Sequence, residues 1–356
     1  MQLAEQSVGL ASPNPAVGCA LIQGDRLVGE GFHAYELRDH AEIVALRQAG
    51  PLARGATAYV TLEPCSHHGR TGPCADALLA AGVARVVVAT VDPNPLVQGK
   101  GIARLRAAGV EVEAGVLEAP ARRLNDGFAK FITTSLPFVT MKVAATLDGR
   151  IAPAQHTAGA PFWITGEHSR AQVHRIRHAA DALIVGVGTV LADDPLLTDR
   201  SNLPRRRPLL RIVLDSTLRT PLDSQLVRSA QQDVLILFNH ASEAAQRALE
   251  ARGVRLQHIP SRSPAQRIPL PDVLSLLSKM EITSLLLEGG AQLYASALNQ
   301  NLVDKLTLFY APQFLGPAAV PMLSSVERLP AIQHYSLKRF GEDFAFEAYL
   351  HDPWLA

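Results

Sequence analysis

One histidine, one glutamate and two cysteines stand at a spacing that suits zinc chemistry. Glu42 lies two residues after His40, and Cys65 and Cys74 follow further along the chain. One imidazole and two thiolates would give zinc three protein ligands and leave the fourth tetrahedral position open to water, which marks a catalytic site. Glu42 would stand beside that set as a proton carrier, not as a ligand.

The same residues have simpler explanations. A His-x-Glu pair is often a solvated surface pair, and two cysteines are often small buried hydrophobic residues. Their joint occurrence, with Pro64 directly before Cys65, favours a metal site. Nucleobase deaminases carry His-x-Glu, Pro-Cys and a second Cys, but here that second Cys comes nine residues after the first, so the pattern is a variant. We expect a zinc hydrolase that acts on an amino-substituted heterocycle.

Composition narrows the protein class. A length of 356 residues with 47% hydrophobic content suggests two domains with sizeable cores. A net charge of +1 argues against a nucleic-acid binder. Three cysteines indicate no disulfide framework, and thiolate ligands suit a reducing compartment, so we expect a cytoplasmic protein. No apolar run is long enough to span a bilayer, so no membrane association is expected.

Short elements must position the zinc ligands. The turn at Pro13-Asn14-Pro15 leads into an apolar strand, and Asn14 offers a donor and an acceptor for reading a heterocycle edge, although it is equally suited to forming the turn. We predict a strand at 27–32, a helix at 41–48 that His40 opens, and a strand at 59–62 that delivers Cys65. His67 and His68, between the cysteines, are alternative ligands or part of a substrate-facing loop with Arg70.

Strand and helix patterns alternate along both halves of the chain. A helix at 75–81, a strand at 83–91, a helix at 102–108 and a strand at 110–116 complete a layered α/β domain over 1–117. The polar stretch 118–136 is predicted to be a linker. A second α/β domain is predicted over 137–356, with strands at 137–144, 182–187, 210–214, 233–238, 284–287, 305–310 and 344–350. It lacks Gly-x-Gly-x-x-Gly, but Gly turns at 186–188 and 289–290 can hold a phosphate through backbone N–H groups.

Several motifs together resemble the family of bifunctional deaminase–reductases of riboflavin biosynthesis. In the first half these are Ser12-Pro13-Asn14-Pro15, Val17-Gly18-Cys19, His40-Ala41-Glu42, the run from Thr61 to Thr71, and Asp92-Pro93-Asn94-Pro95. In the second half they are Lys142 with Leu147-Asp148-Gly149, Trp163-Ile164-Thr165, Asp193-Asp194-Pro195 and Leu287-Glu288-Gly289-Gly290. The resemblance covers nearly the whole chain and implies a cytidine-deaminase-like three-layer domain joined to a dihydrofolate-reductase-like domain.

The resemblance also implies an activity and a set of site residues. The family deaminates 2,5-diamino-6-ribosylamino-4(3H)-pyrimidinone 5′-phosphate and then reduces the ribosyl chain to ribityl with NADPH. The implied roles are zinc ligation by His40, Cys65 and Cys74, proton donation by Glu42, NADP contact at Ala144, Trp163, Thr189, Asp193 and Gly290, and substrate contact at Arg177, Arg200 and Glu288. Two departures from the family pattern are Pro161, where a Ser is usual, and the stretch 36–39 before His40.

Two rival hypotheses remain. The first is a cytidine or deoxycytidylate deaminase whose second half is not catalytic. The second is a binding module in which zinc is structural and His67 or His68 fills its fourth position.

We also expect a homo-oligomer, with a dimer through the reductase half as the favoured form. Whether Lys142 or Asp148 assists proton transfer is left open by the sequence.

Overall fold

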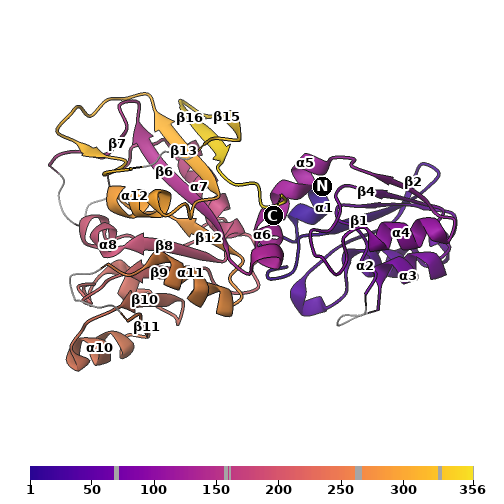
Figure 1. Cartoon of the computed structure of the whole chain (residues 1–356), viewed down its shortest axis with the longest axis horizontal. Helices are drawn as coiled ribbons and strands as arrows, with labels where there is room; N and C mark the ends of the chain where they lie inside the picture. The colour runs from indigo at the N-terminus through magenta and orange to yellow at the C-terminus, as the bar shows by residue number, and fades with distance from the viewer. Residues whose placement is uncertain (68–71, 156–158, 160–161, 261–266, 328–330, 356) are drawn as a thin grey trace. The chain divides into compact units, whose positions relative to one another are not determined.

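The computed structural model describes residues 1–67, 72–155, 159, 162–260, 267–327 and 331–355. The chain divides into two compact units (Figure 1). Unit 1 comprises Met1–Ser135, Pro204–Arg207 and Pro353–Ala356, and unit 2 comprises Leu136–Leu203 and Pro208–Asp352. None of the helices in the described ranges combines the length and the apolar character that crossing a membrane requires.

Unit 1 is built on a five-stranded sheet in the order β2-β1-β3-β4-β5. Its strands are β1 (Gly18–Gln23), β2 (Arg26–Phe32), β3 (Thr57–Val60), β4 (Arg85–Val88) and β5 (Glu111–Ala114). Strand β1 runs antiparallel to both β2 and β3, whereas β3, β4 and β5 are parallel. The helices are α1 (Gln2–Glu5), α2 (Ala41–Ala49), α3 (Cys74–Ala80), α4 (Lys100–Ala107), α5 (Glu118–Leu124) and α6 (Asp126–Thr134), with 3-10 turns η1 (Tyr35–Leu37) and η2 (Gly50–Ala53).

Two glycines on β2 let helix α2 lie unusually close to the sheet. A Cβ added to Gly31 would stand 2.6 Å from the carbonyl oxygen of Ala41, and one added to Gly29 would stand 2.2 Å from that of Ala45. Small buried residues, Ala41 and Ala45 among them, face the sheet from α2. This close fit fixes the first turn of α2, where His40 and Glu42 lie.

Unit 2 is built on a nine-stranded sheet in the order β11-β10-β9-β8-β12-β6-β13-β16-β15. Its strands are β6 (Phe138–Thr146), β8 (Ala182–Gly186), β9 (Leu210–Leu214), β10 (Val234–Phe238), β11 (Arg255–His258), β12 (Ser284–Leu287), β13 (Lys305–Ala311), β15 (His334–Phe340) and β16 (Asp343–Tyr349). The strands from β11 to β13 in that order run parallel to one another. Strand β16 pairs antiparallel with β13, and β15 pairs antiparallel with β16. Strands β7 (Arg150–Ala152) and β14 (Val320–Pro321) form a small second sheet.

In the described part of unit 2, six helices accompany the large sheet: α7 (Glu167–Ala179), α8 (Val187–Asp193), α9 (Gln225–Arg228), α10 (Glu243–Glu250), α11 (Leu270–Lys279) and α12 (Ala291–Asn299). Apolar side chains of the central strands are buried on both faces, because they belong to two separate hydrophobic clusters. Ile184 and Leu285 belong to one cluster, and Leu183 and Leu286 to the other. Burial on both faces explains why these strands read as continuous apolar runs in the sequence.

Most of the predicted strands are present. The strands predicted at 210–214 and 284–287 coincide with β9 and β12, and the helix predicted at 41–48 is α2. The sequence did not reveal β7, β11, β14 and β15. The stretch 118–136 carries α5 and α6, and Asn125 between them holds unit 1 together through its side-chain hydrogen bonds with the backbone N–H and carbonyl of Ala16.

Candidate active sites

The three predicted zinc ligands come together in unit 1 at the starts of two helices. His40 is the N-cap residue of α2, Cys74 is the first residue of α3, and Cys65 lies in the segment that follows β3. Their ligand atoms all lie within 4.8 Å of one another. Among the described residues, these three are the group of histidine, cysteine and acidic side chains placed to hold a metal.

The distances suit a tetrahedral zinc ion. His40 Nδ1 lies 3.2 Å from Cys74 Sγ and 3.6 Å from Cys65 Sγ. Bonds of about 2.3 Å to sulfur and 2.0 Å to nitrogen place tetrahedral ligand atoms about 3.5–4 Å apart. The backbone N–H of Cys74 also donates to Cys65 Sγ at 3.2 Å, which suits a thiolate. The donor set and its spacing therefore fit zinc with one open position.

The protonation of the two thiols supports this arrangement. The hydrogen bond from Cys74 lowers the pKa of Cys65 to about 4, so Cys65 is ready to ligate as a thiolate. That same hydrogen bond, together with burial, raises the pKa of Cys74. The two sulfurs thus share one proton, which metal binding must displace.

Glu42 has the environment of a proton carrier. The residue is buried, and burial raises the pKa of its carboxyl to about 7 despite the opposing charge of His40. A carboxyl that titrates near neutral pH can both accept and donate a proton during a reaction. Glu42 lies two residues after His40, in the first turn of α2, but it is not part of the ligand group.

Glu63 is a further residue that shapes the metal site, although the sequence gave it no role. Its buried carboxylate accepts hydrogen bonds from the backbone N–H groups of Asp92, Gly99, Gly101 and Ile102, at 2.8–3.2 Å. A Cβ on Gly101 would stand 1.9 Å from the carbonyl oxygen of Pro64. Glu63 therefore ties the turn that carries Cys65 to the start of α4.

A hydrogen-bond relay orients Asn14. His33 Nδ1 lies 2.9 Å from the carbonyl oxygen of Asp39, which can only accept, so Nδ1 carries the proton. His33 Nε2 then accepts from the Asn14 amide nitrogen at 3.0 Å. Burial lowers the pKa of His33, in keeping with a neutral ring. The relay leaves the Asn14 amide oxygen for other partners, and His33 was not singled out from the sequence.

The loop between the cysteines is only partly described. His67 is exposed and stands outside the ligand group. His68 and Arg70 lie outside the described residues, as does Pro161 in the second half.

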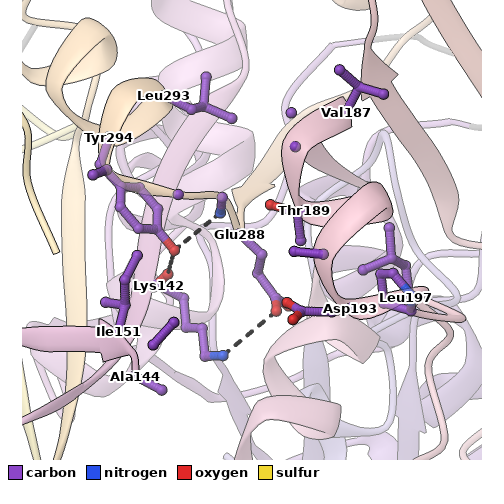
Figure 2. A pocket seen from close by; sticks show the side chains of 18 of the residues that line it. Lys142, Ala144, Ile151, Val187, Thr189, Asp193, Leu197, Glu288, Leu293 and Tyr294 are labelled. Atoms are coloured by element: carbon purple, nitrogen blue, oxygen red, sulfur yellow. Dashed lines mark hydrogen bonds and ion pairs between the residues drawn. The ribbon is translucent and has the colours of Figure 1, made fainter. Parts of the chain in front are cut away.

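In unit 2, a cavity of about 1340 Å³ opens beside the ends of β6, β8 and β12 (Figure 2). Ligands of open α/β sheets bind at the carboxyl ends of parallel strands, and these three strands are parallel neighbours. All eight second-half residues proposed from the sequence line this one cavity: Ala144, Trp163, Arg177, Thr189, Asp193, Arg200, Glu288 and Gly290.

A buried cluster of three charges lies in the cavity wall. Arg177 makes a two-pronged contact with Glu288, Nε to Oε1 at 2.7 Å and Nη2 to Oε2 at 2.9 Å. Lys142 Nζ lies 3.5 Å from Glu288 Oε2, as the dashed line in Figure 2 marks. Burial alone would raise the pKa of Glu288, but the charges of Arg177 and Lys142 outweigh it and hold the pKa at about 2. Burial also lowers the pKa of Lys142, which Glu288 partly offsets.

Tyr294 braces this cluster from α12. Its hydroxyl donates to the Lys142 carbonyl oxygen at 2.8 Å and accepts from the Gly289 N–H at 3.0 Å, both drawn in Figure 2. The brace joins β6 to the turn after β12, so Lys142 and Glu288 keep a fixed spacing. Tyr294 is another residue that the sequence did not single out.

Two glycine turns give the cavity room for a dinucleotide phosphate. A Cβ added to Gly186, Gly188 or Gly290 would meet no atom within 4 Å, so the backbone there is open. Gly290 is the N-cap of α12, where free N–H groups favour anions. Cavity size, open glycine backbone and the helix start together fit NADPH.

Comparisons with known proteins agree with these two sites. The family model of the cytidine and deoxycytidylate deaminase zinc-binding region matches residues 1–90, and the RibD C-terminal domain matches 137–346. The Riboflavin biosynthesis protein RibD of Escherichia coli is 40% identical over 96% of this chain and 95% of its own, and that of Aquifex aeolicus is 39% identical over 96% and 94%. This chain belongs to the RibD family.

Solved structures show the same fold over nearly the full length. RibD of Acinetobacter baumannii has a TM-score of 0.82 at 38% identity, with 98% of this chain and 96% of that chain covered. The Thermotoga maritima diaminohydroxyphosphoribosylaminopyrimidine deaminase/5-amino-6-(5-phosphoribosylamino)uracil reductase has 0.79 at 32%, with 98% and 95% covered.

Family membership settles the main sequence predictions. The predicted fold is confirmed: a cytidine-deaminase-like domain is followed by a dihydrofolate-reductase-like domain. The protein is a bifunctional enzyme of riboflavin biosynthesis, a zinc-dependent deaminase and an NADPH-dependent reductase. The rival hypothesis of a non-catalytic second half is not favoured, because that half matches the family's reductase domain.

Proposed function

We propose that the enzyme deaminates 2,5-diamino-6-ribosylamino-4(3H)-pyrimidinone 5′-phosphate and then reduces the ribosyl chain of the product to ribityl. The name of the Thermotoga maritima relative supports this substrate class. The observation that carries the proposal is the presence, in one chain, of an open three-ligand metal centre beside a buried carboxyl and a cavity lined by cationic groups and glycine turns.

In the deaminase site, residues of unit 1 move protons and orient the ring. When bound at His40, Cys65 and Cys74, zinc lowers the pKa of its water towards about 7. Glu42 would accept one proton of the attacking water and give it to the ring nitrogen, then take the second proton from the new C–OH group and give it to the amine, which leaves as ammonia. The Asn14 amide oxygen, left free by the His33 relay, accepts a hydrogen bond from the N–H edge of the pyrimidine.

In the reductase site, residues of unit 2 hold the two reactants. NADPH, when bound, supplies the hydride to C1′ of the opened sugar. Ala144, Trp163, Thr189, Asp193 and Gly290 line the cavity as its contact positions, and Arg177, Arg200 and Glu288 serve the substrate. Lys142 brings a cationic N–H to the same wall, next to Glu288.

A substrate comparison tests this assignment. The intact enzyme is given cytidine, deoxycytidylate or the diaminopyrimidine ribosyl phosphate, and released ammonia is measured. Only the last compound should release ammonia, and mass spectrometry should show a product that gains two hydrogens once NADPH is added. Ammonia from cytidine or deoxycytidylate at a comparable kcat/KM, or a deaminated product that NADPH leaves unchanged, would contradict the proposal.

We also propose the domain limits 1–117 and 137–356, with 118–136 joining them, and a cytoplasmic location that keeps the thiolate ligands reduced. The hydrophobic clusters of unit 1 and unit 2 supply separate cores for the two activities. Limited proteolysis should cut near residues 135–136, where α6 has ended and the second unit begins, before it cuts either core.

A homodimer through the reductase domain is the assembly that we favour. The outermost strand of its large sheet, β15, exposes Tyr335 and Leu337, at 69% and 63%. Large apolar side chains exposed on an edge strand offer a surface that a second chain can cover. Light scattering should give a dimer mass, which Leu337→Asp lowers to that of a monomer. Leu37→Asp, which alters an equally exposed leucine of unit 1, should leave the dimer intact.

A further inference from the structure

His174 is the one cavity-lining histidine of unit 2 among the described residues, and the sequence gave it no role. It lies on α7, one turn before Arg177, and its side chain reaches the same cavity. Its Nδ1 atom is sealed from solvent and has no hydrogen-bond partner in the described part of the chain. Buried polar atoms without a partner are rare and costly, so this one calls for an explanation.

The protonation of the ring follows from its surroundings. Burial lowers the pKa of His174, and the charges of Arg177 and Arg200 lower it further, against a smaller opposing effect of Glu288 and Asp199. The ring is therefore neutral and carries a single N–H. A proton on Nδ1 would be a buried donor without an acceptor among the described residues, so we assign the single proton to Nε2.

The second nitrogen is the accessible one. Nε2 makes no hydrogen bond with the described residues. Unlike Nδ1, it is not buried from solvent. Nε2 is therefore open to solvent at the cavity wall, where its N–H is a donor that is still without an acceptor.

The neighbouring arginines differ in what they can offer to an anion. The guanidinium of Arg177 is engaged by Glu288 on two sides, and its Nη1 donates to the Thr198 carbonyl oxygen at 3.1 Å. Arg200 makes one side-chain contact within the described chain, Nε to Thr198 Oγ1 at 3.3 Å. Its terminal N–H groups make no hydrogen bond with the described residues, so Arg200 and His174 each bring an available donor to the cavity.

We propose that His174, through its Nε2–H and together with Arg200, binds the 5′-phosphate of the reductase substrate. The proposal rests on the function proposed above and adds a specificity-determining residue to it. A neutral N–H next to a free guanidinium pairs with phosphate oxygens without needing a proton of its own.

Three variants of the intact enzyme test the role of Nε2. His174→Gln keeps an N–H near the position of Nε2, whereas His174→Asn places its amide near Nδ1 and His174→Ala keeps neither. With the deaminated 5′-phosphate as substrate, the Asn and Ala variants should raise the substrate KM roughly 10- to 100-fold, the range that one hydrogen bond to a charged group produces. The Gln variant should stay within about 3-fold of wild type. The KM for NADPH and the deaminase rate should not change.

The dephosphorylated substrate identifies the group that is bound. The difference between wild type and His174→Ala should vanish with that compound, and inorganic phosphate should inhibit the wild type more strongly than the Ala variant. A difference that persists without the phosphate would overturn the proposal, as would equal KM values for the Asn and Gln variants. A wild-type enzyme that fails to reduce the deaminated 5′-phosphate at all would instead contradict the proposed function.

Discussion

The metal site of unit 1 and the cavity of unit 2 are assembled in different ways. The metal ligands sit at the first turns of α2 and α3 and in one short segment, so backbone elements set their positions. The cavity residues come from strands, helices and loops between Lys142 and Ser324, and charged side chains among them hold one another in place. The first site should therefore fail when a single ligand is lost. The second should fail when its charge balance is disturbed.

Loss of a ligand should give the largest effect. Cys74→Ser replaces a thiolate by a hydroxyl, which is a poor zinc ligand, so zinc content and deamination should both be lost while reduction of the deaminated substrate survives. Metal analysis and the two separate assays measure this. Cys19→Ala, which alters the buried cysteine outside the ligand group, is the control and should keep its zinc. Unchanged zinc content in Cys74→Ser would show that another side chain is the third ligand.

The acid–base residue of the same site should give the next largest effect. Glu42→Gln keeps the shape of the side chain and removes its proton chemistry, so deamination should fall by about 10²–10⁴-fold with zinc retained. Reduction should be unaffected. Parallel metal analysis decides the interpretation, because loss of zinc in this variant would make Glu42 a ligand.

The charge cluster of unit 2 should show the contrasting behaviour. Glu288→Gln leaves Lys142 and Arg177 buried without their counter-charge, so reduction should be lost and unit 2 destabilised by about 3 kcal/mol. Deamination should continue. Denaturant unfolding followed separately for each activity measures the effect, and equal destabilisation of both activities would break the comparison.

Acid should act on this cluster with a defined sign. The pKa of Glu288 is held at about 2, below its unfolded value of about 4.3, so its stabilisation is complete above that value. That stabilisation is lost as the pH falls from about 4.3 towards 2. Over this range wild-type unit 2 should lose more stability than Glu288→Gln, as thermal unfolding at stepped pH would show. Parallel curves for the two proteins would contradict the assigned charge state.

A change at the contact between strand β2 and helix α2 should give the smallest effect. It tests whether this close packing positions the zinc ligands of unit 1. Gly31→Ala places a methyl group 2.6 Å from the Ala41 carbonyl oxygen and must displace the start of α2. We expect a loss of about 1–3 kcal/mol in stability and weaker zinc binding, with reduction unchanged. Gly72→Ala, whose added Cβ would meet nothing within 4 Å, is the matched control. A Gly31→Ala protein with wild-type zinc affinity would mean that α2 does not depend on this close fit.

The two regions also differ in what their sequence reveals. His40, Cys65 and Cys74 were identified from residue type and spacing, because their chemistry is local. Glu63 was missed because its role depends on backbone N–H groups up to 39 residues away. His33 was missed because its role depends on contacts with the Asn14 side chain and the Asp39 carbonyl that only the fold creates. In unit 2 the central strands were predicted because burial on both faces makes them continuously apolar.

Exposure explains the features of unit 2 that were missed. Six of the seven residues of β15 are exposed, so no burial pattern marks this strand. His174 lies in a polar stretch of α7 that reads as a solvated helix face. The role of such a residue appears only once the cavity beside it is known. The eight cavity positions named from the sequence rested on family resemblance, because no local pattern of residue types marks them.

The central claim is that one chain carries two successive reactions, the first independent of NADPH and the second dependent on it. The direct measurement supplies the diaminopyrimidine ribosyl phosphate to the intact enzyme, with and without NADPH, and follows ammonia and NADPH together. Ammonia should appear at the same rate in both cases, and NADPH oxidation should follow it after a lag and reach the same amount. NADPH oxidation that precedes ammonia release, or ammonia release that never leads to oxidation, would contradict the claim.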